Sequence, residues 1–315
     1  MAKNKFLFLK VVLSFLLLSM ILRFVVYALE VKSEFKVPDC ESNRILQLKD
    51  PLMTGYDVIE LEERMIELGV YSGPAFGVYD YRLAQAVTAF QGSKELEPNG
   101  IVGPETWNAL AGEDSEDRPT NAKPRPKGKI TLTIHVNSRT LTVYSDGEVY
   151  KRYPIGVGKA STPTPIGEWK IVHKSTGWGG GFGTRWLGLN IPWGIYGIHG
   201  TNKPWSIGRA ESHGCIRMHN KDVEELFSWI TVGTEVDIIG DISHIQVKDN
   251  LSPGRTGKDI VKFQMILREA GFNPGRADGR YGQQTIDAIK SLQRYYSLPV
   301  TGIAGPDEFI LLKLK

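Results

Sequence analysis

The chain lacks several features that would indicate other classes of protein. Its 38 lysines and arginines are nearly matched by 35 aspartates and glutamates, and the net charge of +3 at pH 7 is too small to indicate a nucleic-acid partner. The glycine-rich run from Thr176 to Gly183 lacks the Gly-Lys-Ser/Thr ending of a phosphate-binding loop, which argues against nucleotide binding. Cysteine is also scarce, because Cys40 and Cys215 are the only two among 315 residues.

The N-terminus has the pattern of an export segment. Three lysines precede an apolar run over residues 11–22, and the apolar character resumes after Arg23 as far as Leu29. The tripeptide at 26–28 has the small-x-small form of a signal-peptidase site, but the total apolar length could also span a bilayer. We therefore predict that residues 1–30 are a signal peptide or a membrane anchor, and that the rest of the chain lies outside the cytoplasm.

Cys215 lies among histidines, glycines and an arginine. An isolated thiol titrates near about 8.5, and a neighbouring imidazole or cation converts it to a reactive thiolate near neutral pH. Three of the chain's six histidines are close to it in sequence. This pattern favours a nucleophile over a buried structural cysteine. The candidates for activating it are His199, His213, His219 and Arg217.

Exported chains usually pair their cysteines. Here a bridge could form only between Cys40 and Cys215, and it would consume the candidate nucleophile. Cys40 also lies in a stretch with little pattern, just after the export segment, and the residues before it do not resemble a lipoprotein processing site. We predict that both thiols are free.

An ungapped internal repeat occurs at an offset of 202 residues. Gly55 matches Gly257, and Gly103-Pro104 matches Gly305-Pro306. Between these points the apolar residues recur at helical spacing in both copies, and a Gly-Pro turn suited to helix initiation follows. Each copy is therefore predicted to be a small three-helix domain. The predicted ranges are 43–112 and 250–315.

The region between the copies has a different pattern. Residues 113–128 are charged and rich in proline, which is typical of a linker. From Ile130 onward, apolar and polar residues alternate between tight turns at 137–138 and 146–147, which predicts a β-meander. Further strands are predicted at 168–172, 187–191, 197–199 and 235–239, and a helix at 221–229. Residues 129–240 are thus expected to form a mainly-β domain.

This β domain resembles the L,D-transpeptidase catalytic domain, the YkuD-like family. The resemblance is carried by Thr162–Gly167, Tyr196–Thr201, Ser212–Met218, Asp222 and Gly233–Val236. Both repeat copies resemble the peptidoglycan-binding module called PGB-like, through the closing turn Gly100–Thr106 and its second copy, which has Glu308 in place of the threonine. The resemblance implies a multidomain α+β protein, with a mainly-β L,D-transpeptidase catalytic domain between two small three-helix peptidoglycan-binding domains.

The resemblance also implies a peptidoglycan L,D-transpeptidase that needs no cofactor or metal ion. Cys215 would attack the carbonyl between the diamino acid at the third position of a stem peptide and the D-alanine at the fourth. The thioester would then pass to a side-chain amine of another stem, forming a cross-link in cell wall biogenesis. His199 is the implied base, with His213 second. The candidate substrate-binding residues are Gly214, Arg217, Ser212 and Tyr196.

The residue types suit these roles. Glycine lets a backbone approach its substrate, so amides around Gly214 could hold an oxyanion. From the same side of an extended backbone, His213 could orient the thiolate or line the oxyanion pocket. Arg217 could bind a substrate carboxylate, raise the local potential or form only a salt bridge. The glycine-rich loop could cover the site as a lid, with Trp178 and Phe182 touching a glycan or peptide.

Several alternatives remain open at this stage. Water as acceptor would make the chain an L,D-carboxypeptidase that trims stem tetrapeptides, and a free D-amino acid would make it an exchange enzyme. A zinc-dependent peptidoglycan peptidase is another, because His199, His213, Cys215 and His219 are zinc-compatible, although their spacing matches no familiar zinc motif. The last is a non-catalytic wall-binding protein. In every case the expected partner is peptidoglycan. The chain is expected to be secreted to the cell wall or anchored to the outer face of the cytoplasmic membrane.

Overall fold

The computed structural model describes residues 44–111, 123–176, 180–248 and 250–314. The predicted export segment, Cys40 and residues 113–122 of the predicted linker lie outside these ranges. Within them, no helix combines the length and the apolar character that crossing a bilayer requires.

The first helical unit, residues 44–111, contains three helices around an apolar core. The helices are α2 (Tyr56–Glu67), α3 (Tyr81–Ser93) and α4 (Pro104–Ala111). The helically spaced apolar residues fill the core, including Val58, Leu61, Met65 and Leu83. The Gln91 side chain connects α3 to the turn before α4, because it accepts a hydrogen bond from the Gly100 amide and donates to the Ile101 carbonyl.

The second helical unit, residues 250–314, repeats this arrangement with α6 (Lys258–Glu269), α7 (Gln283–Tyr295) and α8 (Pro306–Leu311). Gln293 takes the place of Gln91 and donates to the Ile303 carbonyl. Glu308, which replaces the threonine of the first copy, accepts hydrogen bonds from Gln293 and from the Gly305 amide. The substitution therefore preserves the turn.

Two of the repeated glycines are required by the backbone. Gly77 and Gly279 have φ angles of 76° and 65°, in the left-handed region that favours glycine. A Cβ atom at either position would also lie 2.9 Å from the carbonyl oxygen of Gly55 or Gly257, respectively. The same close approach explains why these glycines recur in both copies.

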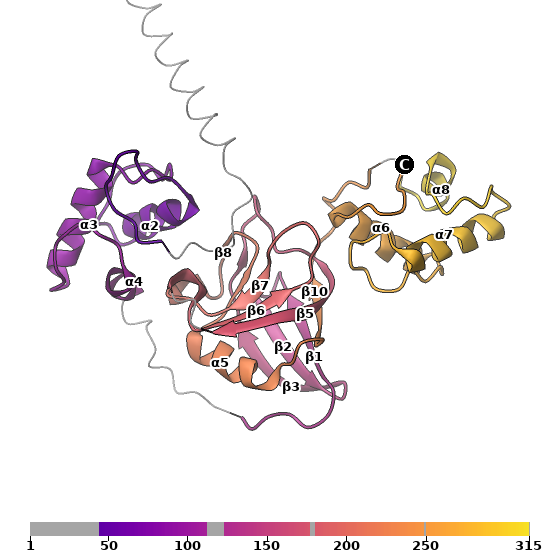
Figure 1. The fold of residues 1–315 in the computed structure, drawn as a ribbon, viewed down its shortest axis with the longest axis horizontal. Coiled ribbons are helices and arrows are strands. Elements are labelled where there is room, and N and C mark those ends of the chain that lie inside the picture. The colour runs from indigo at the N-terminus through magenta and orange to yellow at the C-terminus, as the bar shows by residue number, and fades with distance from the viewer. Residues whose placement is uncertain (1–43, 112–122, 177–179, 249, 315) are drawn as a thin grey trace, which may run out of the picture. The chain divides into compact units, whose positions relative to one another are not determined.

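The central domain, residues 129–240, is built on one eight-stranded sheet and one long helix (Figure 1). The strand order is β3-β2-β1-β10-β5-β6-β7-β9. The strands are β1 (Ile130–His135), β2 (Thr140–Ser145), β3 (Glu148–Pro154), β5 (Gly167–Thr176), β6 (Arg185–Leu189), β7 (Gly197–His199), β9 (Ile216–Arg217) and β10 (Glu235–Ile239). A second, small sheet pairs β4 (Val157–Gly158) with β8 (Ala210–Ser212).

The β-meander prediction is confirmed, since β1, β2 and β3 pair as antiparallel neighbours. β10 then pairs in parallel with β1 and antiparallel with β5. The predicted helix is α5 (Asn220–Trp229), which lies against β6 and β7. The long-range β1–β10 pairing brings the start and the end of the domain together.

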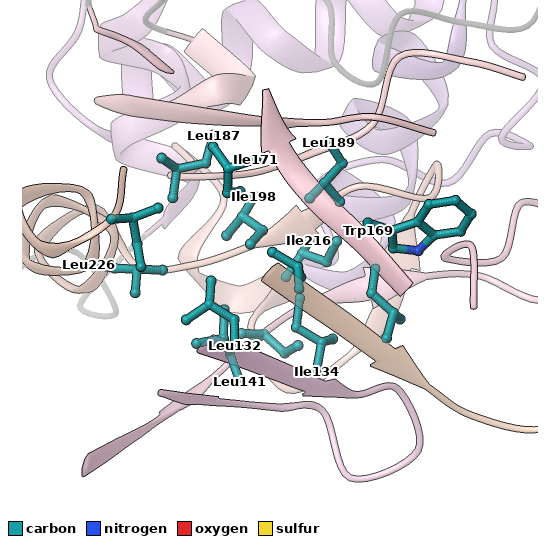
Figure 2. Close-up of a cluster of buried hydrophobic side chains, with 14 of the residues drawn as sticks. Leu132, Ile134, Leu141, Trp169, Ile171, Leu187, Leu189, Ile198, Ile216 and Leu226 are labelled. Atoms are coloured by element: carbon teal, nitrogen blue, oxygen red, sulfur yellow. The ribbon is translucent and has the colours of Figure 1, made fainter. Parts of the chain in front are cut away.

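The core of the central domain lies between the two halves of its sheet. Figure 2 shows Leu132, Ile134 and Leu141 of β1 and β2 on one side of this core, with strand residues such as Leu187 on the other. Leu226 of α5 enters from the edge. Burial of such side chains contributes about 1.5 to 3 kcal/mol each. Ile198 of β7 and Ile216 of β9 belong to this core, which positions the strands of the candidate site.

Candidate active site

The candidate nucleophile lies at the edge of the large sheet. β7 and β9 run parallel, with Ile198 opposite Ile216 and His199 opposite Arg217. Ile198 and Ile216 point into the core, so the alternation of side chains places His199 and Arg217 on the other face. Cys215, two residues before Arg217, belongs to that same face. The structure thus places His199 and Cys215, two of the predicted catalytic residues, on one face of this sheet edge.

Aromatic rings surround the cysteine and the first histidine. Cys215 packs with Phe182, Trp186 and Tyr196. The Trp186 ring stacks on His199 with 5.6 Å between centroids, and the Phe182 ring meets His199 edge-on at 5.2 Å. Phe182, which was expected to touch a glycan or peptide from a loop, is buried against His199, and its contact with a ligand stays a prediction. Trp178 lies outside the described residues.

His199 is fully buried and held in one orientation. Its Nδ1 lies 2.5 Å from the Gly200 carbonyl oxygen, which requires the proton to be on Nδ1. Its Nε2 has no hydrogen-bond partner among the described residues. Burial, together with the Arg217 and Lys203 cations, lowers the pKa of His199 to about 3, although the Gly200 carbonyl and Glu60 oppose this change. The ring is therefore neutral at pH 7, with Nε2 available to accept a proton.

His213 is the second buried histidine near Cys215 in sequence, and its neighbours differ from those of His199. Burial is the main reason that its pKa falls to about 4, with Glu60 opposing this change. Its Nδ1 lies 3.9 Å from the Glu60 Oε1 atom. The predicted third candidate, His219, lies half-buried at the start of α5, and Asp222 lies in the first turn of that helix.

The sulfur of Cys215 is not a free thiol in this structure. Cys215 is buried and disulfide-bonded, so the prediction that both thiols are free is wrong for this residue. The only other cysteine in the sequence is Cys40, which lies outside the described residues. A nucleophilic role for Cys215 therefore requires its reduced form, because the thiolate is the attacking species.

Ser212 and Gly214 shape the backbone before the cysteine. The Ser212 hydroxyl donates to the Cys215 carbonyl at 2.6 Å and accepts from the Gly214 amide at 3.2 Å. The Gly214 amide is thus engaged within the turn and does not point at an oxyanion here. Gly214 has a φ of 114°, and a Cβ atom there would lie 2.7 Å from the Tyr196 ring. Glycine at this position lets Tyr196 cover the turn.

The sequence analysis missed two buried charged residues beside the candidate site, Glu60 and Lys203. Glu60 belongs to α2 of the first helical unit, and its carboxylate forms ion pairs with Arg217 and with Lys203 of the central domain. All three side chains are buried. One signal was present in the sequence: the repeat places Lys262 at the position of Glu60, a reversal of charge within otherwise matching copies.

A cleft of about 360 Å³ opens beside this ion cluster. Its walls come from α2 and from the central domain. The lining residues are Glu60, Glu63, Arg64, Glu67, Lys159, Lys203, Trp205, Arg209, Ala210, Glu211 and Arg217. In the part of the chain that the structure describes, no cluster of three or more histidine, cysteine, aspartate or glutamate side chains is placed to hold a metal ion.

The sequence matches known families over all three of these regions. Residues 129–238 match the model of the YkuD family, described as the L,D-transpeptidase catalytic domain. Residues 54–110 and 256–312 each match the model described as "Putative peptidoglycan binding domain".

Individual relatives agree with these matches. "Putative L,D-transpeptidase YkuD" of Bacillus licheniformis is 51% identical over 107 residues, which are 34% of this chain and 64% of that protein. The Bacillus subtilis protein of the same name is 50% identical over 107 residues with the same coverage, so the chain spans 64% of the length of these two relatives.

A solved structure of an L,D-transpeptidase (residues 123–326) from Xylanimonas cellulosilytica is 26% identical. It aligns over 64% of this chain and all of that one, with a TM-score of 0.32. "Putative L,D-transpeptidase YqjB" of Bacillus subtilis is 41% identical over 125 residues, which are 34% of this chain and 71% of that protein. Because the chain covers 71% of this 41% identical relative and matches the domain models, it belongs to the L,D-transpeptidase family, with a YkuD catalytic domain flanked by two peptidoglycan-binding domains.

Proposed function

We propose that the protein is a peptidoglycan L,D-transpeptidase that uses Cys215 as its nucleophile and His199 as its base. The observation that carries the proposal is the state of His199, which is neutral, oriented by the Gly200 carbonyl and without a hydrogen-bond partner at Nε2 among the described residues. It lies on the same sheet face as Cys215, and Trp186 contacts both residues.

The proposed reaction begins with reduced Cys215. Its proton passes to His199 Nε2 as the sulfur attacks the carbonyl between the third and fourth residues of a donor stem peptide. The carbon–nitrogen bond then breaks, and the His199 proton goes to the leaving amine of D-alanine. In the second half, the acceptor amine loses a proton to His199 as it attacks the thioester, and Cys215 leaves as the thiol.

The low pKa of His199 determines how the proton moves. A histidine with a pKa of about 3 does not hold a proton against a thiol, so a stable thiolate–imidazolium pair does not form in the resting enzyme. Proton transfer therefore accompanies carbon–sulfur bond formation. The same low pKa makes the protonated ring a strong acid toward the leaving amine.

The first helical unit offers a place for the glycan or peptide of the wall. A groove of about 660 Å³ runs along α3 and the turn before α4, lined by residues that include Tyr81, Gln85, Thr88 and Asn99. Tyr81 is 64% exposed, and an exposed ring beside amide and hydroxyl groups suits a sugar. We place the working protein outside the cytoplasm because peptidoglycan is there, with residues 1–30 as the export signal or anchor.

Replacing Tyr81 with alanine is expected to weaken binding of the chain to purified sacculi about fivefold, since an aromatic contact contributes about 1 kcal/mol. Cosedimentation of the protein with sacculi measures this. Phe76→Ala is the matched control, because Phe76 is a similarly exposed ring in the same unit, outside the groove. Equal loss in both variants would contradict the assignment of the groove.

The function is tested by mass spectrometry of the reduced protein incubated with disaccharide-tetrapeptide. The expected result is an adduct that has lost D-alanine and maps to the peptide containing Cys215, together with a cross-linked dimer. An adduct with only tripeptide product would indicate the carboxypeptidase alternative. Activity that is lost with a chelator and restored by zinc, with no adduct, would overturn the thiol mechanism.

A further inference from the structure

The ring of Tyr196 covers the turn that carries Cys215. Tyr196 packs against the small cluster that contains Cys215, and a Cβ atom at Gly214 would lie 2.7 Å from the Tyr196 ring. The Tyr196 carbonyl accepts a hydrogen bond from the Leu189 amide at 2.8 Å. The backbone of Tyr196 is therefore fixed at the end of β6, and the part that remains to be positioned is its side chain.

The side chain of Trp193 holds the Tyr196 hydroxyl. Burial raises the pKa of Tyr196, and a hydrogen bond from the Trp193 side chain opposes this change. An indole N–H can only donate, so the Tyr196 hydroxyl is the acceptor. A Cβ atom at Gly194 would lie 2.7 Å from the Tyr196 ring, and glycine in this turn therefore gives the ring its place. Without the indole N–H, the Tyr196 side chain would regain rotational freedom.

Trp193 is in turn fixed by contacts with two parts of the chain. Its ring meets the buried Trp169 ring edge-on, with 5.5 Å between centroids. It also lies against the second helical unit, because a Cβ atom at Gly279 would lie 2.5 Å from the Trp193 ring. Only a residue without a Cβ atom permits this approach. Trp193 thus contacts both the core of the central domain and the second helical unit.

The second helical unit shares a core with the central domain. Val261 of α6 and Ala277 of the loop before α7 are fully buried in the same cluster as Trp169. The Glu168 amide donates to the Ala277 carbonyl at 3.0 Å, and the Ala277 amide donates to the Glu168 carboxylate at 3.0 Å. The two parts are therefore packed together as closely as strands within one sheet.

Two arginines of the second helical unit reinforce this contact. Arg276 donates to the Trp169 carbonyl at 3.0 Å, and Arg280 donates to the Asn190 carbonyl at 2.7 Å. These bonds fix the strand that carries Trp169 and the start of the segment 190–196 that contains Trp193. The equivalent residues of the first copy are Pro74 and Val78. The arginines are therefore specific to the copy that packs on the central domain.

We propose that Trp193 is a positioning residue that holds Tyr196 as a wall of the site for the donor stem peptide, and that the second helical unit holds Trp193 in place. This inference rests on the proposed function, in which the donor approaches Cys215. A side chain that is fixed beforehand loses little rotational freedom when the donor binds, so the hydrogen bond from Trp193 strengthens donor affinity. The second helical unit thereby supports the active site.

The test measures donor binding in the reduced Cys215→Ala chain, where no acylation can occur. Trp193→Phe keeps an aromatic ring but lacks the N–H, and it is expected to weaken binding of the disaccharide-tetrapeptide about fivefold. Titration calorimetry gives both the Kd and the stoichiometry. A variant that is merely destabilised would lower the stoichiometry and keep the Kd, because only its folded fraction binds. An unchanged Kd would overturn the inference.

A second variant tests whether Trp193 acts through Tyr196. Tyr196→Phe removes the acceptor of the same hydrogen bond. In the Tyr196→Phe chain, Trp193→Phe should weaken donor binding no further, since the bond between the two side chains is already absent. A further loss of about fivefold would show that Trp193 acts independently of the Tyr196 hydroxyl, and would overturn its positioning role.

The contribution of the second helical unit is tested by removing the two arginines of its contact. Arg276→Ala combined with Arg280→Ala is expected to weaken donor binding about threefold, as the loss of hydrogen bonds loosens Trp193. The matched control is Arg255→Ala combined with Arg294→Ala, because Arg255 pairs with Asp259 of its own unit and Arg294 is exposed. Circular dichroism establishes that each variant is folded. Equal donor binding by the two double variants would overturn the role of the second helical unit.

Failure of the inference can be told apart from failure of the proposed function. Adduct formation on Cys215 in the reduced wild-type chain, with no effect of Trp193→Phe on the Kd, would leave the transpeptidase proposal standing and remove the positioning role. Weaker tetrapeptide binding by Trp193→Phe, without any adduct on Cys215 in the wild-type chain, would support the positioning role and overturn the reaction.

Discussion

Replacing His199 with glutamine is expected to slow acylation of reduced Cys215 by about a hundredfold to ten-thousandfold, the usual contribution of a general base. Glutamine is close in size to histidine and can bond to the Gly200 carbonyl, but it cannot accept the thiol proton. The rate is measured as the appearance of the tetrapeptide adduct by mass spectrometry. Circular dichroism checks that the variant retains its fold.

The pH profile separates a base from a structural residue. Because burial lowers the pKa of His199 to about 3, its neutral form is complete above that pH, and protonation of His199 does not limit the wild-type rate at higher pH. We expect a nearly flat acylation rate between about pH 5 and pH 7. Without the base, only the pre-existing thiolate reacts, so the His199→Gln rate should rise about tenfold per pH unit below the thiol pKa.

His213→Gln is the informative control, because His213 is also buried, neutral and near Cys215. Its replacement should lower the rate by less than about tenfold and keep the flat profile, as expected of a positioning residue. If the His213 variant instead acquires the steep profile and the His199 variant stays flat, the roles of the two histidines are reversed.

The parts of this molecule that were predictable from sequence depend on local patterns. Alternating residues indicated the strands of the central domain, and the 202-residue repeat indicated both helical units. The run containing Cys215 and the upstream His199 was also recognisable, because each residue type has a specific chemical use. These features need only neighbours in sequence, or a second copy of the same motif.

The parts that were missed depend on contacts between distant segments. Glu60 meets Arg217 across 157 residues of sequence, and nothing around Glu60 predicts this contact except the charge reversal at Lys262. Phe182 looked like an exposed loop residue because it lies in a glycine-rich run, yet it packs on His199. Tertiary packing determined its place, and local sequence did not.

The state of Cys215 was also mispredicted, for a physical reason. We expected free thiols because a bridge removes the nucleophile, but this reasoning assumed that the structure shows the active form. Disulfides persist outside the reducing cytoplasm, so an exported chain can hold its nucleophile in oxidised form. Under the proposed mechanism, the disulfide-bonded Cys215 of the structure therefore makes activity depend on reduction.

The protein is accordingly expected to form no detectable tetrapeptide adduct when its disulfide is intact, and to form it after treatment with a thiol reductant. A sulfur in a disulfide has no thiolate with which to attack the peptide carbonyl. Adduct mass is measured before and after reduction, and alkylation with iodoacetamide counts the free thiols in each sample. Two new alkylation sites after reduction would establish that a disulfide was present.

Cys40→Ser provides the matched variant, because Cys40 is the only other cysteine in the sequence and the chain then cannot form an internal disulfide. This variant should form the adduct without reductant, at the rate of the reduced wild-type chain. Equal adduct formation by the wild-type chain with its disulfide intact would mean that a group other than the Cys215 thiolate attacks the substrate. A reduced chain that forms the adduct only when Cys40 is present would show instead that Cys40 takes part in the reaction.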